Sequence, residues 1–232
     1  MSAEHSDPPA EGLLAIWHDV APGCEALVRD WYNEEHHAER LEVPGFLSAH
    51  RYERASGDGA AIMTLYRTVT PDVLWSAPYR ERLQKPSDRT RAVMPTYQNM
   101  CRTACRLSWS VGAGDGEAVA VLAVADNRQR ASLRHARLAT ALQSMAAMPG
   151  VRRWRWIVRV VPPQAGGTSA ERDLRHGSDD DIAWALLVDA DHEQQALDGL
   201  AEIEKRIRPL AADDVRVRQR ARYRLVYPSH RQ

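Results

Sequence analysis

The chain has 232 residues, more than the roughly 100 to 150 of a usual single domain, so two small domains or one domain of two halves are expected. Its 31 basic residues balance 31 acidic ones, which excludes a global attraction to nucleic acid or to anionic lipid. No apolar run approaches the roughly 20 residues that span a bilayer, and the three cysteines lack the spacing of a disulfide framework or a cysteine zinc site.

The predicted elements begin after a short first segment, residues 1–11, which lacks the basic and apolar regions of a secretory signal. We expect a disordered leader there, on a cytoplasmic protein that has neither nucleic acid nor a membrane as a partner. Apolar periodicity then predicts strand, helix, strand, strand, helix and strand, at residues 13–20, 24–41, 46–54, 60–69, 72–97 and 100–111. The same order recurs at residues 118–125, 131–148, 151–161, 182–189, 192–210 and 215–227.

This repeated order predicts an α+β fold built from two ferredoxin-like βαββαβ repeats. A Pro-Gly turn follows the first helix of each repeat, at Gly45 and at Gly150, an offset of 150 − 45 = 105 residues. We expect the first repeat at 12–112, a glycine-rich linker at 113–116 and a second, diverged repeat at 117–228.

The strands at 119–125 and 182–188 are apolar on both alternating faces, so both faces of each sheet should be buried. Helices of a ferredoxin-like repeat cover one face only. The other faces are therefore expected to pack against each other as a pseudo-dimer within one chain. Whether two such chains associate further as a homodimer stays open at this stage.

The segment at 162–181 is rich in glycine, proline, serine and charge, whereas the corresponding loop of the first repeat is only a few residues long. A disordered insertion is the favoured interpretation. A lid over a cavity is the alternative.

Two stretches carry a resemblance to a known family: "IWHDVAPGCEALVRDWYNEEHHAERLEVPGFLSAHRYE" and "LYRTVTPDVLWSAPYRERL". They resemble the EthD-like branch of the dimeric α/β-barrel superfamily over residues 13–110, whereas 117–228 shares only the order of elements and one Pro-Gly turn. His37 and Ala38 stand where the family pattern has Leu-Pro, so the helix is expected to continue further here. The resemblance implies a scaffold that serves cofactor-independent monooxygenases, cyclases, isomerases, haem enzymes and proteins without known activity, and it names no reaction.

His36 is the first candidate catalytic residue. On a regular helical wheel Tyr32, His36 and Arg40 form a stripe opposite Trp31, which turns His36 toward solvent. A functional role would require the helix to break near His36 and bring the imidazole to a cavity, where it could act as a general base near neutral pH.

No metal or haem cofactor is expected. The adjacent side chains of His36 and His37 diverge by about 100° on a helix and cannot easily share one ion. An axial haem ligand needs a histidine that faces a large cavity, and the wheel does not offer one.

Arginine alternates with apolar residues on the strands at 151–160 and 215–227. If helices cover the apolar faces, the arginines line the interior or its rim, where Arg220 and Arg222 could hold the charge of an anionic substrate. Alternatively, the ladder protects strand edges or pairs with acids such as Glu53.

Four polar residues lie on otherwise apolar strands: His18, Asp19, His50 and Tyr66. Each alone is most simply structural, but together they are candidates for a ligand pocket. The leading hypothesis is a cofactor-independent enzyme of the isomerase, cyclase or monooxygenase kind, acting on a compact, partly apolar, anionic small molecule. His36, His50 and Tyr66 would be catalytic, and His18 and Asp19 would bind substrate with the arginines. A non-catalytic ligand-binding protein and a structural partner in a complex are the alternatives.

Overall fold

The computed structural model describes residues 10–125, 140, 142, 148–162, 168–175, 177–207 and 216–231. The expected leader and the expected helix at 131–148 therefore lie almost entirely outside the described residues. No helix within the described part of the chain is long and apolar enough to cross a membrane.

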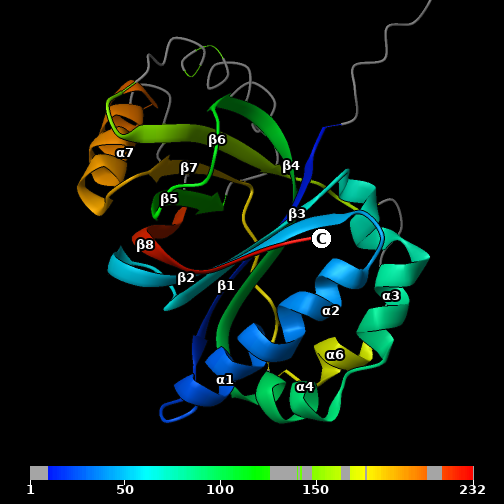
Figure 1. The fold of residues 1–232 in the computed structure, drawn as a ribbon. Coiled ribbons are helices and arrows are strands. Elements are labelled where there is room, and N and C mark those ends of the chain that lie inside the picture. The colour runs from blue at the N-terminus through cyan, green and yellow to red at the C-terminus, as the bar shows by residue number, and fades with distance from the viewer. Residues whose placement is uncertain are drawn as a thin grey trace, which may run out of the picture.

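The described strands form a closed barrel in the order β1-β3-β2-β8-β5-β7-β6-β4 (Figure 1). Their bounds are β1 Gly12–Val20, β2 Phe46–Asp58, β3 Ile62–Thr68, β4 Tyr97–Gly112, β5 Ala118–Ala125, β6 Val151–Arg159, β7 Trp184–Ala190 and β8 Arg216–His230. All neighbouring pairs are antiparallel. The barrel contains two half-sheets with one internal order, β4-β1-β3-β2 and β8-β5-β7-β6, and the predicted α+β class is confirmed.

The two half-sheets are joined along both edges, because β2 pairs with β8 and β4 pairs with β6. The prediction that they enclose a common interior is confirmed, and each of the eight described strands has a partner along both edges. The bounds of the two repeats, and the duplication itself, stay predictions.

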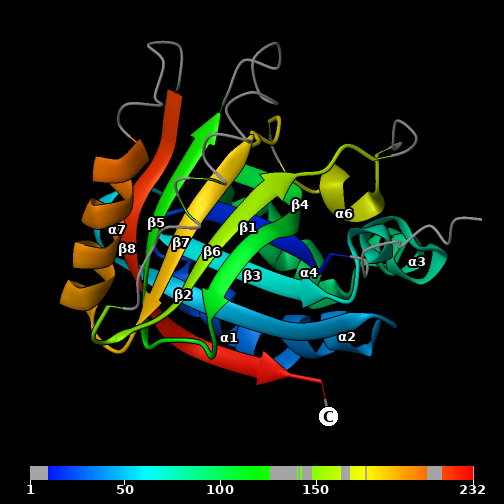
Figure 2. The same ribbon diagram turned by 90° about the horizontal axis from the view of Figure 1, so that it is seen from above.

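The helices of the first half gather on one side of the barrel and α7 covers the other (Figures 1 and 2). The first connection is α1 (Glu25–Trp31), a π-helical turn η1 (Tyr32–His36) and α2 (His37–Glu42). The second consists of η2 (Pro71–Trp75), α3 (Ala77–Gln84), α4 (Asp88–Val93) and η3 (Met94–Thr96). The described helices of the second half are α6 (Ala170–Asp173) and α7 (Glu193–Ile207).

The single helix predicted at 72–97 is wrong, and prolines are the reason. Pro78 lies in the first turn of α3, and Pro95 lies in the first turn of η3. Lys85, which precedes Pro86, has left the helical region, as expected because the proline ring clashes with a helical residue before it. The segment is therefore a chain of short turns that can curve around a cavity.

Side chains fill the interior of the barrel. On β1 the alternate residues Leu13, Ala15 and Trp17 point inward, where they pack with Tyr52 and Tyr223 in one apolar cluster. The opposite face of each half-sheet packs against its helices in two further clusters. A ligand site must therefore be sought between sheet and helices.

Candidate functional site

A cavity of about 930 Å³ lies between the sheet of the first half and its helices. Leu14, Ile16 and Tyr66 form part of its floor, and Tyr79 and Leu83 belong to its helical wall. Residues from the segment 168–179 of the second half complete the lining. The volume is in the range of small-molecule pockets, roughly 300 to 1,000 Å³.

A π-helical turn brings His36 to this cavity. The backbone N–H of His37 donates to the carbonyl of Tyr32, five residues earlier, so one more residue is accommodated in this turn than an α-helix would allow. His36 consequently stacks on Trp31, with ring centroids 3.9 Å apart, and is only 5% exposed. The expectation that His36 faces solvent is wrong, because it assumed a regular helix.

Burial and the charge of Arg40 hold the pKa of His36 well below its usual range, so the imidazole is neutral. Within the described residues its Nδ1 has no hydrogen-bond partner, and the nearest carboxylate oxygen, on Glu39, is 4.0 Å away. Neutral imidazole with a free ring nitrogen can accept a proton from a bound molecule.

Tyr66 is the second unsatisfied polar group at the cavity. It projects from β3, is 1% exposed, and its hydroxyl has no partner among the residues that the structure describes. Burial raises its pKa well above the usual value, so the phenol keeps its proton and can donate it in a hydrogen bond. Its ring meets that of His36 edge to face, with centroids 6.3 Å apart.

A directed hydrogen-bond chain runs behind these groups. His18 Nδ1 lies 3.0 Å from the carbonyl oxygen of Asp19 and donates to it, which leaves Nε2 to accept from the Tyr32 hydroxyl at 3.1 Å. The Tyr32 oxygen in turn accepts from Tyr97 at 2.7 Å. Burial lowers the pKa of His18 to about 4, consistent with a neutral ring that acts as the acceptor at the end of this chain.

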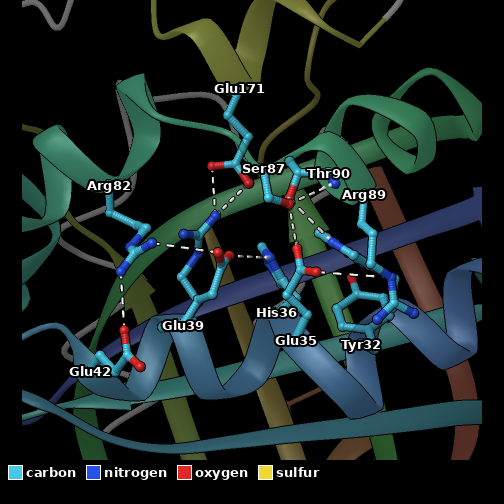
Figure 3. A network of polar contacts seen from close by, with 12 residues as sticks. Tyr32, Glu35, His36, Glu39, Glu42, Arg82, Ser87, Arg89, Thr90 and Glu171 are labelled. Carbon is cyan, nitrogen blue, oxygen red and sulfur yellow. Dashed lines mark hydrogen bonds and ion pairs between the residues drawn. The ribbon is translucent and has the colours of Figure 1, made fainter.

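An ion pair between the two halves contributes to the cavity lining, and Figure 3 shows its carboxylate, Glu171. Arg40 of α2 donates through Nη2 to both carboxylate oxygens of Glu171, the farther one at 2.6 Å, and both side chains are buried. Glu171 lies in α6, within the segment expected to be a disordered insertion. That interpretation is wrong for its described part, because Asp180 of the same segment exchanges backbone hydrogen bonds with β4 at Met100 and Arg102.

Further ion pairs hold the helices around the cavity. Arg82 of α3 contacts Glu39 and Glu42 of α2, at 3.4 and 3.1 Å (Figure 3). Ser87 donates to Glu35 of η1, beside Arg89. These contacts fix the position of the π-helical turn against α3 and α4.

No protein-family model matches the sequence, and no curated protein matches it. Among solved structures, an anthrone oxidase-like protein aligns with 99% of this chain and 95% of its own, with a TM-score of 0.62 and 10% identity. A candidate monooxygenase from Fusobacterium nucleatum subsp. nucleatum aligns over 96% and 95%, with a TM-score of 0.57 and 9% identity. Another, from Lactobacillus acidophilus, aligns over 96% and 97%, with a TM-score of 0.53 and 10% identity.

The chain has the dimeric α/β-barrel fold. The predicted resemblance is thereby confirmed at the level of the superfamily fold. Assignment to its EthD-like branch stays a prediction.

In this dimeric α/β-barrel the other predicted site residues lie away from the cavity lining. Asp19 accepts hydrogen bonds from the backbone of Ala61 at 2.7 Å and from Asn99 at 2.8 Å, which is a structural role. His50 is buried on β2 next to Asp115, with 3.6 Å between Nδ1 and Oδ2. His18 does not line the cavity but contacts two residues that do, Tyr32 through a hydrogen bond and Tyr97 through ring stacking.

The arginines of β8 point to the wrong side for the predicted role. Ala221 and Tyr223 face the barrel interior, so the alternate residues Arg220 and Arg222 face outward toward α7. Arg220 pairs with Glu204 at 2.7 Å and Arg222 with Glu193 at 3.2 Å. On β6 the expectation of inward arginines is correct, since Arg155 is buried and pairs with Asp189 at 2.5 Å.

The cations that do line the cavity of the barrel were missed by the sequence analysis. They are Arg40, Arg80, Arg102, Arg172 and Arg175. Arg102 lies on β4 and donates to the Tyr79 hydroxyl at 3.0 Å, and among the described residues no carboxylate lies within ion-pair distance of it. Its alternation with Met100 and Ala104, both on the helix-facing side, is the signal that could have identified it.

Proposed function

We propose that the cavity binds a partly apolar, anionic small molecule and removes a proton from it without a tightly bound cofactor. One observation carries the proposal: His36 and Tyr66 line the same cavity, and each has a buried polar atom, Nδ1 and the hydroxyl oxygen, that lacks a partner among the described residues. Buried polar atoms without partners are costly in a folded protein and are typical of groups that meet a ligand.

The lining suits such a molecule. Leu14, Ile16 and Met94 offer apolar surface for a ring system. Arg102 offers a guanidinium that has its carboxylate-binding donors available, apart from the one used by Tyr79. A ligand held by Arg102 would place its uncharged end toward His36 and Tyr66.

The proposed proton transfer depends on a neutral His36 and a protonated Tyr66. His36, neutral and facing the cavity, accepts a proton from an acidic C–H that is conjugated with a carbonyl group. Tyr66 keeps its proton and donates a hydrogen bond to the enolate oxygen that forms. Glu39, 4.0 Å from Nδ1, stabilises the imidazolium. If the carbanion then meets dioxygen, an anthrone becomes an anthraquinone: its methylene carbon loses two hydrogens, one oxygen atom enters as the carbonyl, and the other leaves as water.

Anthrone is a suitable probe because it has this acidic methylene and because the chain is similar in fold to an anthrone oxidase-like protein. We expect purified protein in air to consume dioxygen and release anthraquinone faster than buffer. His36→Ala and Tyr66→Phe should each slow turnover by about 10²- to 10⁴-fold. Arg220→Ala, which alters an arginine outside the cavity, is the matched control and should leave turnover unchanged.

The anion site is tested with a carboxylated anthrone. Wild-type protein should bind it more tightly than anthrone itself, as followed by fluorescence of Trp75 in the cavity wall, and Arg102→Gln should remove this preference. Equal affinity for both probes in the wild type would contradict the anionic substrate class. Absence of both binding and turnover would contradict the proposal as a whole.

A non-catalytic ligand-binding protein is the second candidate. The low pKa of His36 favours it, because a weak base transfers protons poorly. In that case the carboxylated anthrone binds, no anthraquinone forms, and His36→Ala retains binding.

A further inference from the structure

A second group of chemically active side chains lies outside the cavity, where β2 and β8 meet. His50 comes from β2, Asp115 from the connection between β4 and β5, and His230 from the last position of β8. One potential ligand atom from each residue lies within 4.8 Å of the other two. None of the three lines the cavity, so the group is independent of the proposed function.

The distances suit a metal ion. Zinc bonds to nitrogen and oxygen are roughly 2.0 to 2.2 Å, so neighbouring ligand atoms of a tetrahedral site are about 3.3 Å apart. His50 Nδ1 and Asp115 Oδ2 already lie 3.6 Å apart. The ring of His230 stands at 80° to that of His50, with centroids 5.0 Å apart, and its exposed position allows the small movement that would complete the site.

His50 carries a second, independent sign of a ligand. Its side chain is 3% exposed, and its Nε2 has no hydrogen-bond partner among the described residues. Its Nδ1 has only a long contact, 3.5 Å, with the Tyr52 hydroxyl, besides Asp115. The weakly bonded Nδ1, which faces Asp115, is the nitrogen available to an ion, because a buried imidazole nitrogen normally has a close partner.

The surroundings hold the carboxylate in place. Arg153 donates to Asp115 Oδ1 at 2.8 Å, which leaves Oδ2 directed at His50. Arg153 also lies near Asp189, 3.6 Å away, and Arg155 pairs with the same carboxylate. The nearby cations are thus balanced by acids, and Arg153 is in the place of an outer-shell partner that orients a metal ligand.

We propose that His50, Asp115 and His230 bind one divalent transition-metal ion of the zinc type. Two imidazoles and one carboxylate are ligands that zinc, cobalt and nickel accept. Three protein ligands leave one coordination position for water. The ion would link β2, β8 and the connection between the halves, and so would strengthen one seam of the barrel.

The expectation of no metal rested on cysteine spacing and on the neighbours His36 and His37, and the site proposed here contains none of these residues. The three residues proposed here are 65 and 115 positions apart along the chain, so no spacing motif joins them. The pairing of β2 with β8 brings His50 and His230 together, and the connection between β4 and β5 adds Asp115.

The test is a titration of chelator-treated protein, prepared without a histidine tag, with Co²⁺ as a coloured probe. We expect saturation at one Co²⁺ per chain, with visible absorption bands of a four- or five-coordinate ion that Zn²⁺ abolishes by displacement. His230→Ala and Asp115→Asn should weaken binding by at least the roughly 10- to 100-fold that loss of an outer-shell partner costs. His192→Ala removes an exposed histidine just before α7 and should leave binding unchanged.

Two results would overturn the proposal. One is the absence of saturable Co²⁺ binding to the wild-type protein. The other is binding that both His230→Ala and Asp115→Asn leave unaltered, which would put the ion elsewhere. Because His230 is exposed, its variant is expected to fold, and circular dichroism of both variants checks this. Anthrone turnover is not part of this test, so its outcome is separate from that of the proposed function.

Discussion

The two halves of the barrel share a strand order but differ in what lies between sheet and helices. In the first half the helix-facing side of the sheet carries Tyr66 and His18 and borders a cavity. The described helix-facing residues of β5 and β7, such as Leu122, Leu186 and Val188, are apolar and pack against α7. The same strand order is therefore compatible with a cavity or with a packed apolar core, and the side chains on the helix-facing side of the sheet decide which one forms.

The largest expected effect concerns the ion pairs of the two regions. Glu171→Ala leaves Arg40 buried without its partner and should lower the free energy of unfolding by about 3 to 5 kcal/mol. Glu204→Ala removes the partner of Arg220, which is 58% exposed, and should cost about 0 to 1 kcal/mol. Urea unfolding of both variants measures the difference.

A double variant, Arg40→Met with Glu171→Leu, serves as the control for the buried pair. It should recover most of the stability lost in Glu171→Ala, since no unpaired charge remains. Equal losses for Glu171→Ala and Glu204→Ala would contradict the contrast between the two pairs.

The two Pro-Gly turns offer a smaller comparison. Gly45 and Gly150 both have positive φ, 95° and 76°, so alanine is strained at either position. At Gly45 an added Cβ would also meet Val73 Cγ2 at 2.6 Å, a branched and buried side chain, whereas at Gly150 it meets the flexible end of Gln195. Gly45→Ala should cost about 1 to 3 kcal/mol and more than Gly150→Ala, as thermal unfolding can measure. The reverse order would show that the Val73 contact relaxes freely.

The first half should also give the protein a pH-dependent stability. Burial lowers the pKa of His18 to about 4 and of His37 to about 3, below the 6.5 of an unfolded histidine. The unfolded chain then binds more protons, so stability is full above pH 6.5 and declines as pH falls toward these values. The slope should be about 1.4 kcal/mol per pH unit for each histidine.

Urea unfolding at pH 7, 6 and 5 tests this dependence. His37→Leu should reduce the slope by about 1.4 kcal/mol per pH unit, which is the contribution of one proton. The buried ring of His37 has no partner at either nitrogen among the described residues, so it stays neutral in the folded protein. His192→Leu is the matched exposed control. An unchanged slope in His37→Leu would mean that this histidine titrates normally in the folded protein.

Much of the fold could be predicted because most of the strands are recognisable from their apolar residues in the sequence. Alternation of apolar residues locates the strands, and the Pro-Gly sequences locate two turns. Strands that are apolar on both faces predict the enclosed interior. Pro78, Pro86 and Pro95 indicate the break of the segment 72–97, whereas apolar periodicity alone predicts one long helix there.

The site was harder to predict, for physical reasons. The turn at Tyr32–His36 holds one extra residue, and periodicity analysis assumes a constant turn, so His36 was assigned to the wrong face. Alternation of arginine with apolar residues assigns them to opposite faces of a strand, but it does not show which face points into the barrel. The same arginine pattern therefore points inward at Arg155 on β6 and outward at Arg220 on β8.

Because Glu171 reaches the cavity from the second half, the chamber around this cavity is assembled from two separately encodable pieces of polypeptide. A cut within the connection at 113–116 would leave each piece with two bare seam strands and the first with an unneutralised Arg40. Recombining the pieces would restore the seams and the chamber in one event. The barrel therefore has the layout of a split reporter, in which the chamber forms again only when both fragments meet.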